Sequence, residues 1–280
     1  MKALIQLPLS ALVASLFILT GTAQAQIEVR VGMSDYPPLT ITADWSGIFP
    51  DLLNEIFRGS PYQVTFTSVP YARGFHSLSD GSVDIGILAQ RTVLAREGFT
   101  DEVDVGEPFF IGVSGFVYNS TKHPNLTMTK LSDLKGMTVK VVIGTLHQHF
   151  EDAGMIVSEA SNVPGMLKMV EAQRTDLFYI SDIIAIYLAD SLFPETKDNL
   201  HMLYQSPPSI LNLMLGISKK FSGGHEALRA HIDQRMRQML QDGTYRKILD
   251  KYYRGRGQPE LAIPYQYYGV EPSRDVEPNK

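Results

Sequence analysis

The stretch SLSDGSVDIGILAQR, residues 77–91, carries the pattern that decides the fold class. Its first half ends a short amphipathic helix, which we expect to begin near residue 71 and to stop at Gly81. The apolar run at 83–88 then has the length of a buried strand. Helices that lead directly into buried strands are typical of βαβ units, in which parallel strands alternate with helices. The stretch therefore predicts an α/β fold.

The segments before and after this stretch repeat the alternation. Residues 27–33 alternate apolar and polar side chains as a strand does, and apolar residues at 48–57 recur at helical spacing. The other predicted elements are a strand at 62–69, a small helix and a strand within 131–144, helices at 145–154, 163–174 and 181–190, a strand at 175–180, and helices within 225–253. The pattern starts again near residue 131, so the sequence predicts two similar α/β units.

Two β-rich runs, 109–118 and 203–217, separate and rejoin these units. The last helices need a sheet to cover, and the first unit has one that is uncovered. We therefore expect lobe 1 to hold 26–112 plus 213–255 and lobe 2 to hold 116–207. The predicted fold is a two-lobed α/β protein, in which each lobe is a mixed sheet flanked by helices and two hinge crossings join the lobes. Ligands of such folds bind at the carboxyl ends of the strands, between the lobes.

Both ends of the chain differ from the rest in composition. Residues 1–25 combine Lys2, a short apolar stretch and the small residues Ala23 and Ala25, which predicts a signal peptide cleaved before Gln26. The alternative is a membrane anchor, for which the apolar stretch is short. A signal peptide predicts a periplasmic location. Residues 256–280 are rich in proline and predict an extended C-terminal tail.

The composition excludes several kinds of function. Without Lys2, the charged side chains number 24 basic and 30 acidic, and so mildly acidic a chain has no global attraction to nucleic acid. The absence of cysteine rules out disulfides, Cys-based zinc sites and Cys nucleophiles. His147 and His149 stand two residues apart and would point to different sides of a helix. We expect no metal site and no cofactor.

Seven segments, in this order, resemble the periplasmic solute-binding proteins of the amino-acid type, which are the bacterial extracellular solute-binding family 3 with the type II Venus-flytrap fold. They span nearly the whole chain after residue 25. The segments are VGMSDYPPL, GIFPDLL, SLSDGSVDIGIL, REGFTDEVDVGEPFF, LSDLKGMTVKVVIGT, RTDLFYISDIIAIYL and LQDGTYRKILDKYY. The resemblance implies two lobes that close on a small solute.

The resemblance also implies which lobe 1 residues bind the solute. Tyr36, after the first strand, and Tyr71, on the next loop, hold the places of the side chains that sandwich the ligand. Arg96 matches the arginine that binds the ligand carboxylate, and Arg91 stands where the family has Ser or Thr. Guanidinium groups bind carboxylate or phosphate in bidentate geometry. Two of them in the cleft predict an anionic solute such as a dicarboxylate, a phosphorylated compound or an acidic aromatic.

The lobe 2 residues leave one position open. Thr145 and His147 open a helix whose backbone amides attract anions. The resemblance implies an acid that holds the ligand's ammonium five residues after Asp176. Ser181 falls on that position, and Asp182 follows one residue later. Either residue could face the cleft, so recognition of an α-amino group stays open.

Three functions are compatible with this pattern. The first is a periplasmic binding protein, expected to be a monomer, that captures a small anionic solute for the membrane permease of an ABC importer. The second is a sensory protein that signals to a membrane receptor. The third is an enzyme similar to the cyclohexadienyl dehydratases, which requires a general acid in the cleft. The first is the function that we expect, and it is not enzymatic.

Overall fold

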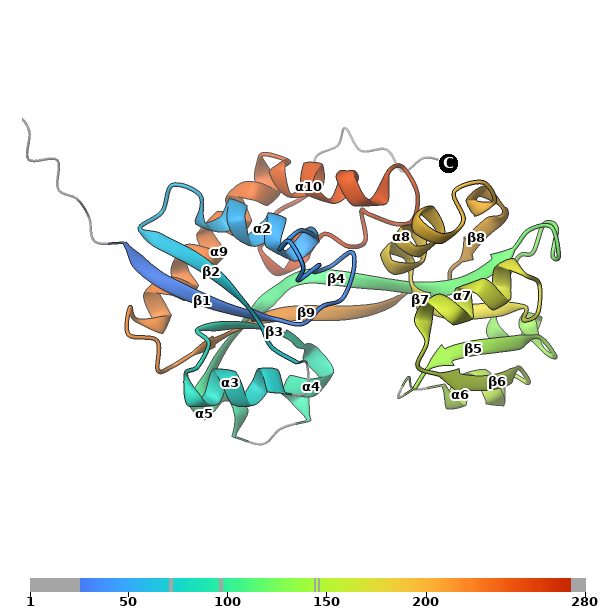
Figure 1. Ribbon diagram of the computed structural model, residues 1–280, viewed down its shortest axis with the longest axis horizontal. Helices are drawn as coiled ribbons and strands as arrows, with labels where there is room; N and C mark the ends of the chain where they lie inside the picture. The colour runs from blue at the N-terminus through green and yellow to red at the C-terminus, as the bar shows by residue number, and fades with distance from the viewer. Residues whose placement is uncertain (1–25, 71–72, 96–97, 144, 146, 273–280) are drawn as a thin grey trace, which may run out of the picture.

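The computed structural model describes residues 26–70, 73–95, 98–143, 145 and 147–272. Figure 1 shows two masses of helices and strands, joined by the long strands β4 (Val103–Asn119) and β9 (Ser209–Ser218). The first mass contains β1 (Ile27–Met33), α2 (Ile48–Phe57), β2 (Tyr62–Ser68), α3 (Gly74–Asp80), β3 (Ile85–Ala89), α4 (Gln90–Leu94), α5 (Phe99–Glu102), α9 (His225–Gln241), α10 (Thr244–Tyr253) and the 3₁₀ helix η4 (Tyr265–Tyr267).

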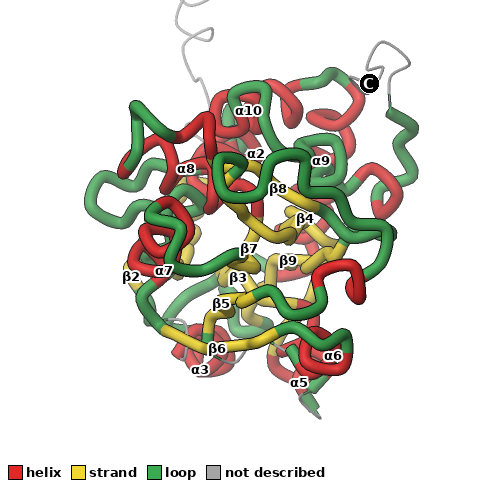
Figure 2. Tube along the Cα trace, turned by 90° about the vertical axis from the view of Figure 1, so that its right-hand side faces the viewer, coloured by secondary structure: helices red, strands yellow, loops and turns green. Residues whose placement is uncertain are grey.

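The second mass is formed by the chain between the two long strands. It contains the 3₁₀ helices η2 (Leu131–Leu134) and η3 (Lys197–Asn199), the strands β5 (Thr138–Val142), β6 (Ile156–Ala160), β7 (Leu177–Ser181) and β8 (Leu200–Leu203), and the helices α6 (Gln148–Asp152), α7 (Val163–Glu171) and α8 (Asp182–Leu192). Figure 2 shows the strands between two layers of helices, with α2, α8 and α10 on one side and α3, α5 and α6 on the other. The prediction of an α/β fold with a mixed sheet flanked by helices is confirmed.

The strands form one continuous hydrogen-bonded path in the order β2-β1-β3-β9-β4-β7-β5-β6, and β8 pairs with β4. β1 is parallel to β2 and β3, and β5 is parallel to β6 and β7, whereas β9 and β4 run antiparallel to their neighbours. The sequence predicted a separate sheet in each lobe. The structure differs because both crossings are themselves unbroken strands, so the ladder continues through them. The lobe limits at residues 112, 116, 207 and 213 stay a prediction.

In each unit, an aspartate just before one parallel strand accepts hydrogen bonds from the neighbouring parallel strand. Asp84, just before β3, accepts hydrogen bonds from the backbone N–H of Arg30 in β1 and from its guanidinium, at 2.8–3.0 Å. Asp176, just before β7, accepts hydrogen bonds from the N–H and the hydroxyl of Thr138 in β5, at 2.8 and 2.6 Å. Each acid ties neighbouring strands together before the strand that follows it, at the end opposite to the one where the sequence predicts the ligand.

The helix ends follow the sequence signals. Gly81 ends α3 with φ of +81°, and Gly243 separates α9 from α10 with φ of +76°, which are backbone conformations that glycine adopts without strain. The side chain of Asn162 caps α7 by accepting a hydrogen bond from the N–H of Gly165. The strand β6 was not predicted, and Ile156 at its start is 58% exposed. None of the described helices is both long and apolar enough to cross a membrane.

The C-terminal segment differs from the prediction of an extended tail. Residues 256–270, which we name the C-terminal strap, make turns and a 3₁₀ helix. Ala262, Ile263 and Tyr268 in this strap are buried, and they belong to the main apolar core with residues of both units. Proline predicted extended chain, but the strap's apolar and tyrosine side chains bury enough surface to hold it against the body.

Candidate functional site

The loop after β1 presents Tyr36 at the surface and holds its backbone rigidly. The N–H of Tyr36 donates to the carbonyl of Thr40 at 2.8 Å, and the N–H of Thr40 donates back at 3.1 Å. Gly47, just before α2, has φ of +120°, and a Cβ there would lie 2.7 Å from the carbonyl oxygen of Pro38. Only glycine fits this contact. Tyr36 is 47% exposed, and a ring that stacks on a solute would need such exposure.

The carboxyl end of β3 leads directly into α4, which has five residues. Arg91 lies in the first turn of α4. Gln90 precedes it, and the Oε1 atom of Gln90 accepts a hydrogen bond of 2.8 Å from the Nδ2 atom of Asn212 in β9. The other two predicted residues of this unit, Tyr71 and Arg96, lie outside the described residues. Their roles, like that of Arg91, stay predictions.

In the second unit, the residues after β5 meet acidic side chains. The Nδ1 atom of His147 lies 2.8 Å from the carbonyl oxygen of Thr145. Carboxylate oxygens of Glu151 and Glu159 each lie 3.7 Å from a ring nitrogen of the same histidine. The helix α6 that follows has only five residues, so its dipole is weak and the two acids oppose the attraction of an anion to its start.

Ser181 ends β7 at the junction of the two units. It is paired with Ser114 in β4, which is in turn paired with Ser209 in β9. Paired residues of neighbouring strands point to the same face, so three hydroxyl groups line up across the junction. The hydroxyl of Tyr179 donates to the Oγ atom of Ser209 at 2.7 Å. Ser181 makes no capping hydrogen bond to α8 and is half-buried.

Asp182, the next residue, is turned toward a different part of the molecule. Its side chain is fully buried. Its donors are the N–H groups of Ile183 at 2.6 Å and Gln258 at 2.9 Å, and the hydroxyls of Tyr204 and Tyr253, each at 3.2 Å. In this geometry a solute ammonium has no path to the carboxylate. The residue that the sequence left as an alternative to Ser181 anchors the C-terminal strap instead.

Burial controls the ionisation of this cluster. It raises the pKa of Asp182 from 3.8 to about 6, and the hydrogen bonds from Gln258, Ile183 and the two tyrosines offset part of that rise. Burial and the nearby carboxylate also raise the pKa of Tyr204 well above its usual range. Both tyrosine hydroxyls therefore keep their protons and act as donors. No signal in the sequence connects these residues, because they are separated by 22 to 71 positions.

Three of the five large exposed apolar side chains of the described residues follow the carboxyl ends of strands, and a fourth, Ile210, lies at the amino end of β9. Leu94 ends α4 after β3, Ile143 follows β5, and Ile210 lies in β9 near the junction, with exposures of 77%, 62% and 49%. Tyr36 after β1 adds to this set, whereas Ile156 is the exception. Exposed apolar side chains are often covered by a ligand or a partner surface.

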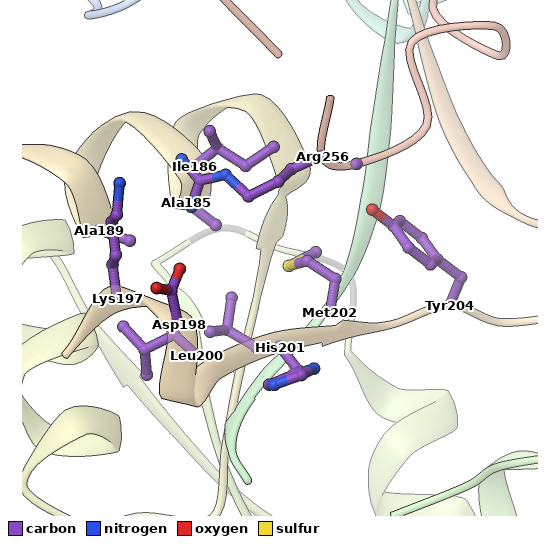
Figure 3. A pocket seen from close by; sticks show the side chains of 12 residues that line it. Ala185, Ile186, Ala189, Lys197, Asp198, Leu200, His201, Met202, Tyr204 and Arg256 are labelled. Carbon is purple, nitrogen blue, oxygen red and sulfur yellow. The ribbon is translucent and has the colours of Figure 1, made fainter. Parts of the chain in front are cut away.

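A cavity of about 360 Å³ lies elsewhere, between α8, β8 and the start of the strap. Figure 3 shows Arg256 along one wall, Lys197 and Asp198 at another, and Met202 on the side of Tyr204. Both cations pair with Asp190, at 2.6 Å for Arg256 and 3.3 Å for Lys197. None of the predicted site residues lines this cavity. Within the part of the chain that the structure describes, no group of three or more His, Asp or Glu residues could hold a metal ion.

The model of one protein family matches most of the chain. Residues 29–255 match the bacterial extracellular solute-binding proteins, family 3. The chain belongs to this family. Its family 3 relatives include a Vibrio harveyi protein provisionally named amino-acid ABC transporter-binding protein PatH, which is 22% identical over 248 residues, or 86% of this chain and 94% of the relative.

Two solved structures share the family 3 fold. The GluR0 ligand-binding core in complex with L-glutamate has a TM-score of 0.62 and 16% identity, and the match covers 81% of this chain and 98% of that one. The L-cystine solute receptor of Neisseria gonorrhoeae in its unliganded open conformation also has a TM-score of 0.62 and 16% identity, covering 82% of this chain and 94% of the other. At such identity the likeness shows the fold alone.

Proposed function

We propose that this family 3 protein captures a small anionic solute, amino-acid-like or a carboxylate, between its two units in the periplasm and delivers it to the permease of an ABC importer. The observation that carries the proposal is the arrangement of β1, β3, β5 and β7. Tyr36, Arg91 and Thr145 follow the first three of these strands, Ser181 ends the fourth, and β4 and β9 join the two units between them. The amino-acid ABC transporter-binding name of the Vibrio harveyi relative supports it.

The mechanism that we propose is closure of the two units about β4 and β9. A solute that touches Tyr36 and α4 on one side and Ser181 and His147 on the other gains both sets of contacts only in the closed state. It therefore shifts the population toward that state. The permease recognises the closed state, so solute binding and delivery are coupled without a chemical reaction.

The chemistry of the predicted residues favours an anionic solute. Arg96 is proposed to bind a carboxylate in bidentate geometry, and Arg91 a second acidic group. Asp182 is enclosed, so an α-amino group would meet the hydroxyl of Ser181 instead of a carboxylate. The apolar side chains at the strand ends would contact the carbon skeleton. The same enclosure makes Asp182 unsuitable as the general acid of a dehydratase-like activity, for which Ser181 and His147 remain the candidates.

Binding of a paired ligand series tests the proposal. Residues 26–280 would be screened by thermal shift against the standard L-amino acids and against succinate, glutarate and adipate, and the binders measured by calorimetry. A solute at about 100 times its Kd adds about 2.7 kcal/mol to the free energy of unfolding. We expect Arg96→Ala to weaken binding about tenfold to a hundredfold, because a charge-assisted hydrogen bond contributes about 1.5–3 kcal/mol.

The substitutions Arg96→Lys and Arg91→Ala refine the result. Arg96→Lys should also weaken binding, because a point charge does not reproduce the planar fork. Arg91→Ala should weaken diacids and spare monoacids. Arg58→Ala is the control, since that arginine is exposed and pairs with a neighbour on its own helix. Unchanged affinity in Arg96→Ala, or equal losses for monoacids and diacids in Arg91→Ala, would contradict the assigned roles.

A further inference from the structure

The C-terminal strap lies beyond the family match, which ends at residue 255, yet it contacts both units and both crossing strands. At its start, the N–H of Gln258 donates to Asp182 at the beginning of α8. In its middle, the carbonyl of Ala262 accepts a hydrogen bond from the N–H of Ile111 in β4, at 3.3 Å. At its end, Tyr267 reaches Asn212 in β9. The strap is therefore tied to the body by contacts spread along its length.

The contact of Tyr267 continues to the predicted solute site. The Nδ2 atom of Asn212 donates to the hydroxyl oxygen of Tyr267 and to the Oε1 atom of Gln90, each at 2.8 Å. Asn212 is 92% buried, as its exposure of 8% shows. Three segments that are distant in sequence thus meet in one chain of hydrogen bonds, which runs from the strap through β9 to the residue before Arg91.

The orientation of the Asn212 amide depends on both partners. An amide NH₂ group has two hydrogens, and here one goes to Tyr267 and the other to Gln90. The Oδ1 atom of Asn212 is buried and has no hydrogen-bond partner among the described residues. The two bonds of the Nδ2 atom therefore determine which way the amide faces. Without the hydroxyl of Tyr267, one of these bonds is lost and the amide can turn away from Gln90.

The helix α4 needs such an anchor. A helix of five residues does not hold its shape or direction by its own hydrogen bonds. Its last residue, Leu94, is 77% exposed, so burial of that side chain does not fix the helix against the body. The hydrogen bond of Gln90 to Asn212 fastens the first turn of α4 to β9. The backbone of Arg91 is in that same turn, so this bond contributes to its position, together with the packing of Val93 against the apolar cluster around Leu88.

We propose that Tyr267 is a positioning residue for the solute site. Through Asn212 it holds Gln90, and with it the first turn of α4 that carries Arg91, against β9. The inference rests on the proposed function, because it assigns to the strap the placement of a residue of that same site. The alternative is that the Tyr267 hydroxyl only stabilises the fold, in which case its loss lowers the thermal stability and leaves the affinity unchanged.

A double-mutant cycle on the chain 26–280 separates the two. The variants are Tyr267→Phe, Gln90→Leu and their combination, with Asn212→Asp as a second way to remove the Nδ2 donor. Tyr265→Phe is the matched control, because its hydroxyl lies in the same 3₁₀ helix and no hydrogen bond joins it to any described residue. The probe is the member of the amino-acid and dicarboxylate panel above that has the lowest Kd for wild type.

We expect Tyr267→Phe to raise the Kd about fivefold, whereas Tyr265→Phe leaves it unchanged. The Tm of Tyr267→Phe falls in either case, because the buried donor of Asn212 loses its partner, so the Kd is the deciding readout. Asn212→Asp should raise it at least as much. In the Gln90→Leu background, Tyr267→Phe should change the Kd less than about twofold, since residues of one network are not additive.

Two results would overturn the inference alone: wild-type affinity in Tyr267→Phe, or effects of Tyr267→Phe and Gln90→Leu that multiply independently. Failure of wild type to bind any member of the panel would instead overturn the proposed function, and the inference with it.

Discussion

The buried carboxyl group of Asp182 should make the free energy of unfolding depend on pH in a direction that can be worked out. Burial raises its pKa from 3.8 to about 6, so between these values the folded chain holds a proton that the unfolded chain has released. The stability contributed by the protonated group is complete below about pH 3.8 and is lost as the pH rises through about 6. The full difference corresponds to about 3 kcal/mol, at about 1.4 kcal/mol per pH unit.

The substitution Asp182→Asn isolates this effect, because asparagine does not titrate. The hydrogen bonds that asparagine makes or loses with Gln258 and Tyr253 do not depend on pH. Their contribution therefore cancels when the difference in free energy of unfolding between variant and wild type is compared at two pH values. Between about pH 4.5 and about pH 7.5, the linkage relation gives about 2 kcal/mol. The free energy of unfolding of the variant minus that of wild type should become more positive by this amount as the pH rises.

Urea unfolding followed by circular dichroism, at constant ionic strength and several pH values across this range, would measure the difference. The slopes with urea should be equal for the two proteins, which shows that the same surface is exposed on unfolding. A difference that stays constant with pH would refute the reasoning. It would mean that the Asp182 carboxyl group keeps its ordinary pKa in the folded protein, and so is within reach of water and of a solute ammonium.

Two further substitutions test the turn before α2 and the clamp at the amino end of β7. Gly47→Ala should lower the free energy of unfolding by about 1–3 kcal/mol in thermal denaturation, because its Cβ would lie 2.7 Å from a carbonyl oxygen. Gly59→Ala is the control, since Gly59 also has a positive φ, of +70°, but has open space around it. Equal losses of stability in the two variants would contradict the clash. Burial alone would raise the pKa of Asp176, but its hydrogen bonds and ion pair hold that pKa below the usual range. The ionised carboxylate therefore stabilises the fold, and the excess free energy of unfolding of wild type over Asp176→Asn should be lost as the pH falls from about 5 to about 2. If the difference in free energy of unfolding between wild type and Asp176→Asn stays constant over this pH range, the linkage is wrong.

The elements that are visible in the sequence are those whose pattern is local. The first strand and the first helix were predicted within a residue of β1 and α2, because alternation and helical spacing are set by near neighbours. The strand β4 begins at Val103, six residues before the predicted run. Its first part contains Pro108 and two register shifts against β9, so both the periodic pattern and the pairing are irregular there.

The parts that sequence analysis did not predict depend on contacts between distant residues. Proline in residues 256–280 indicated extended chain, and nothing local showed that Ala262 would be buried against β4. Ser181 and Asp182 could not be separated by counting positions. The donors that turn Asp182 toward the strap stand at residues 204, 253 and 258. The candidate solute residues came from the family resemblance, and the structure locates Tyr36, Thr145, His147 and Ser181 without testing their roles.

The position of β9 between β3 and β4 governs the order in which the chain can fold. Residues 209–218 complete an edge of β3 and an edge of β4, and they are synthesised about a hundred residues after either. The strands β5, β6 and β7 lie on one uninterrupted stretch and pair with one another and with the end of β4, so their contacts form with short loops. Until β9 is synthesised, β3 and β4 of the first unit have unpaired edges, which are templates for wrong pairing. The protein therefore completes its N-terminal unit last, and any factor that shields the nascent chain would act on β3 and β4 in that interval.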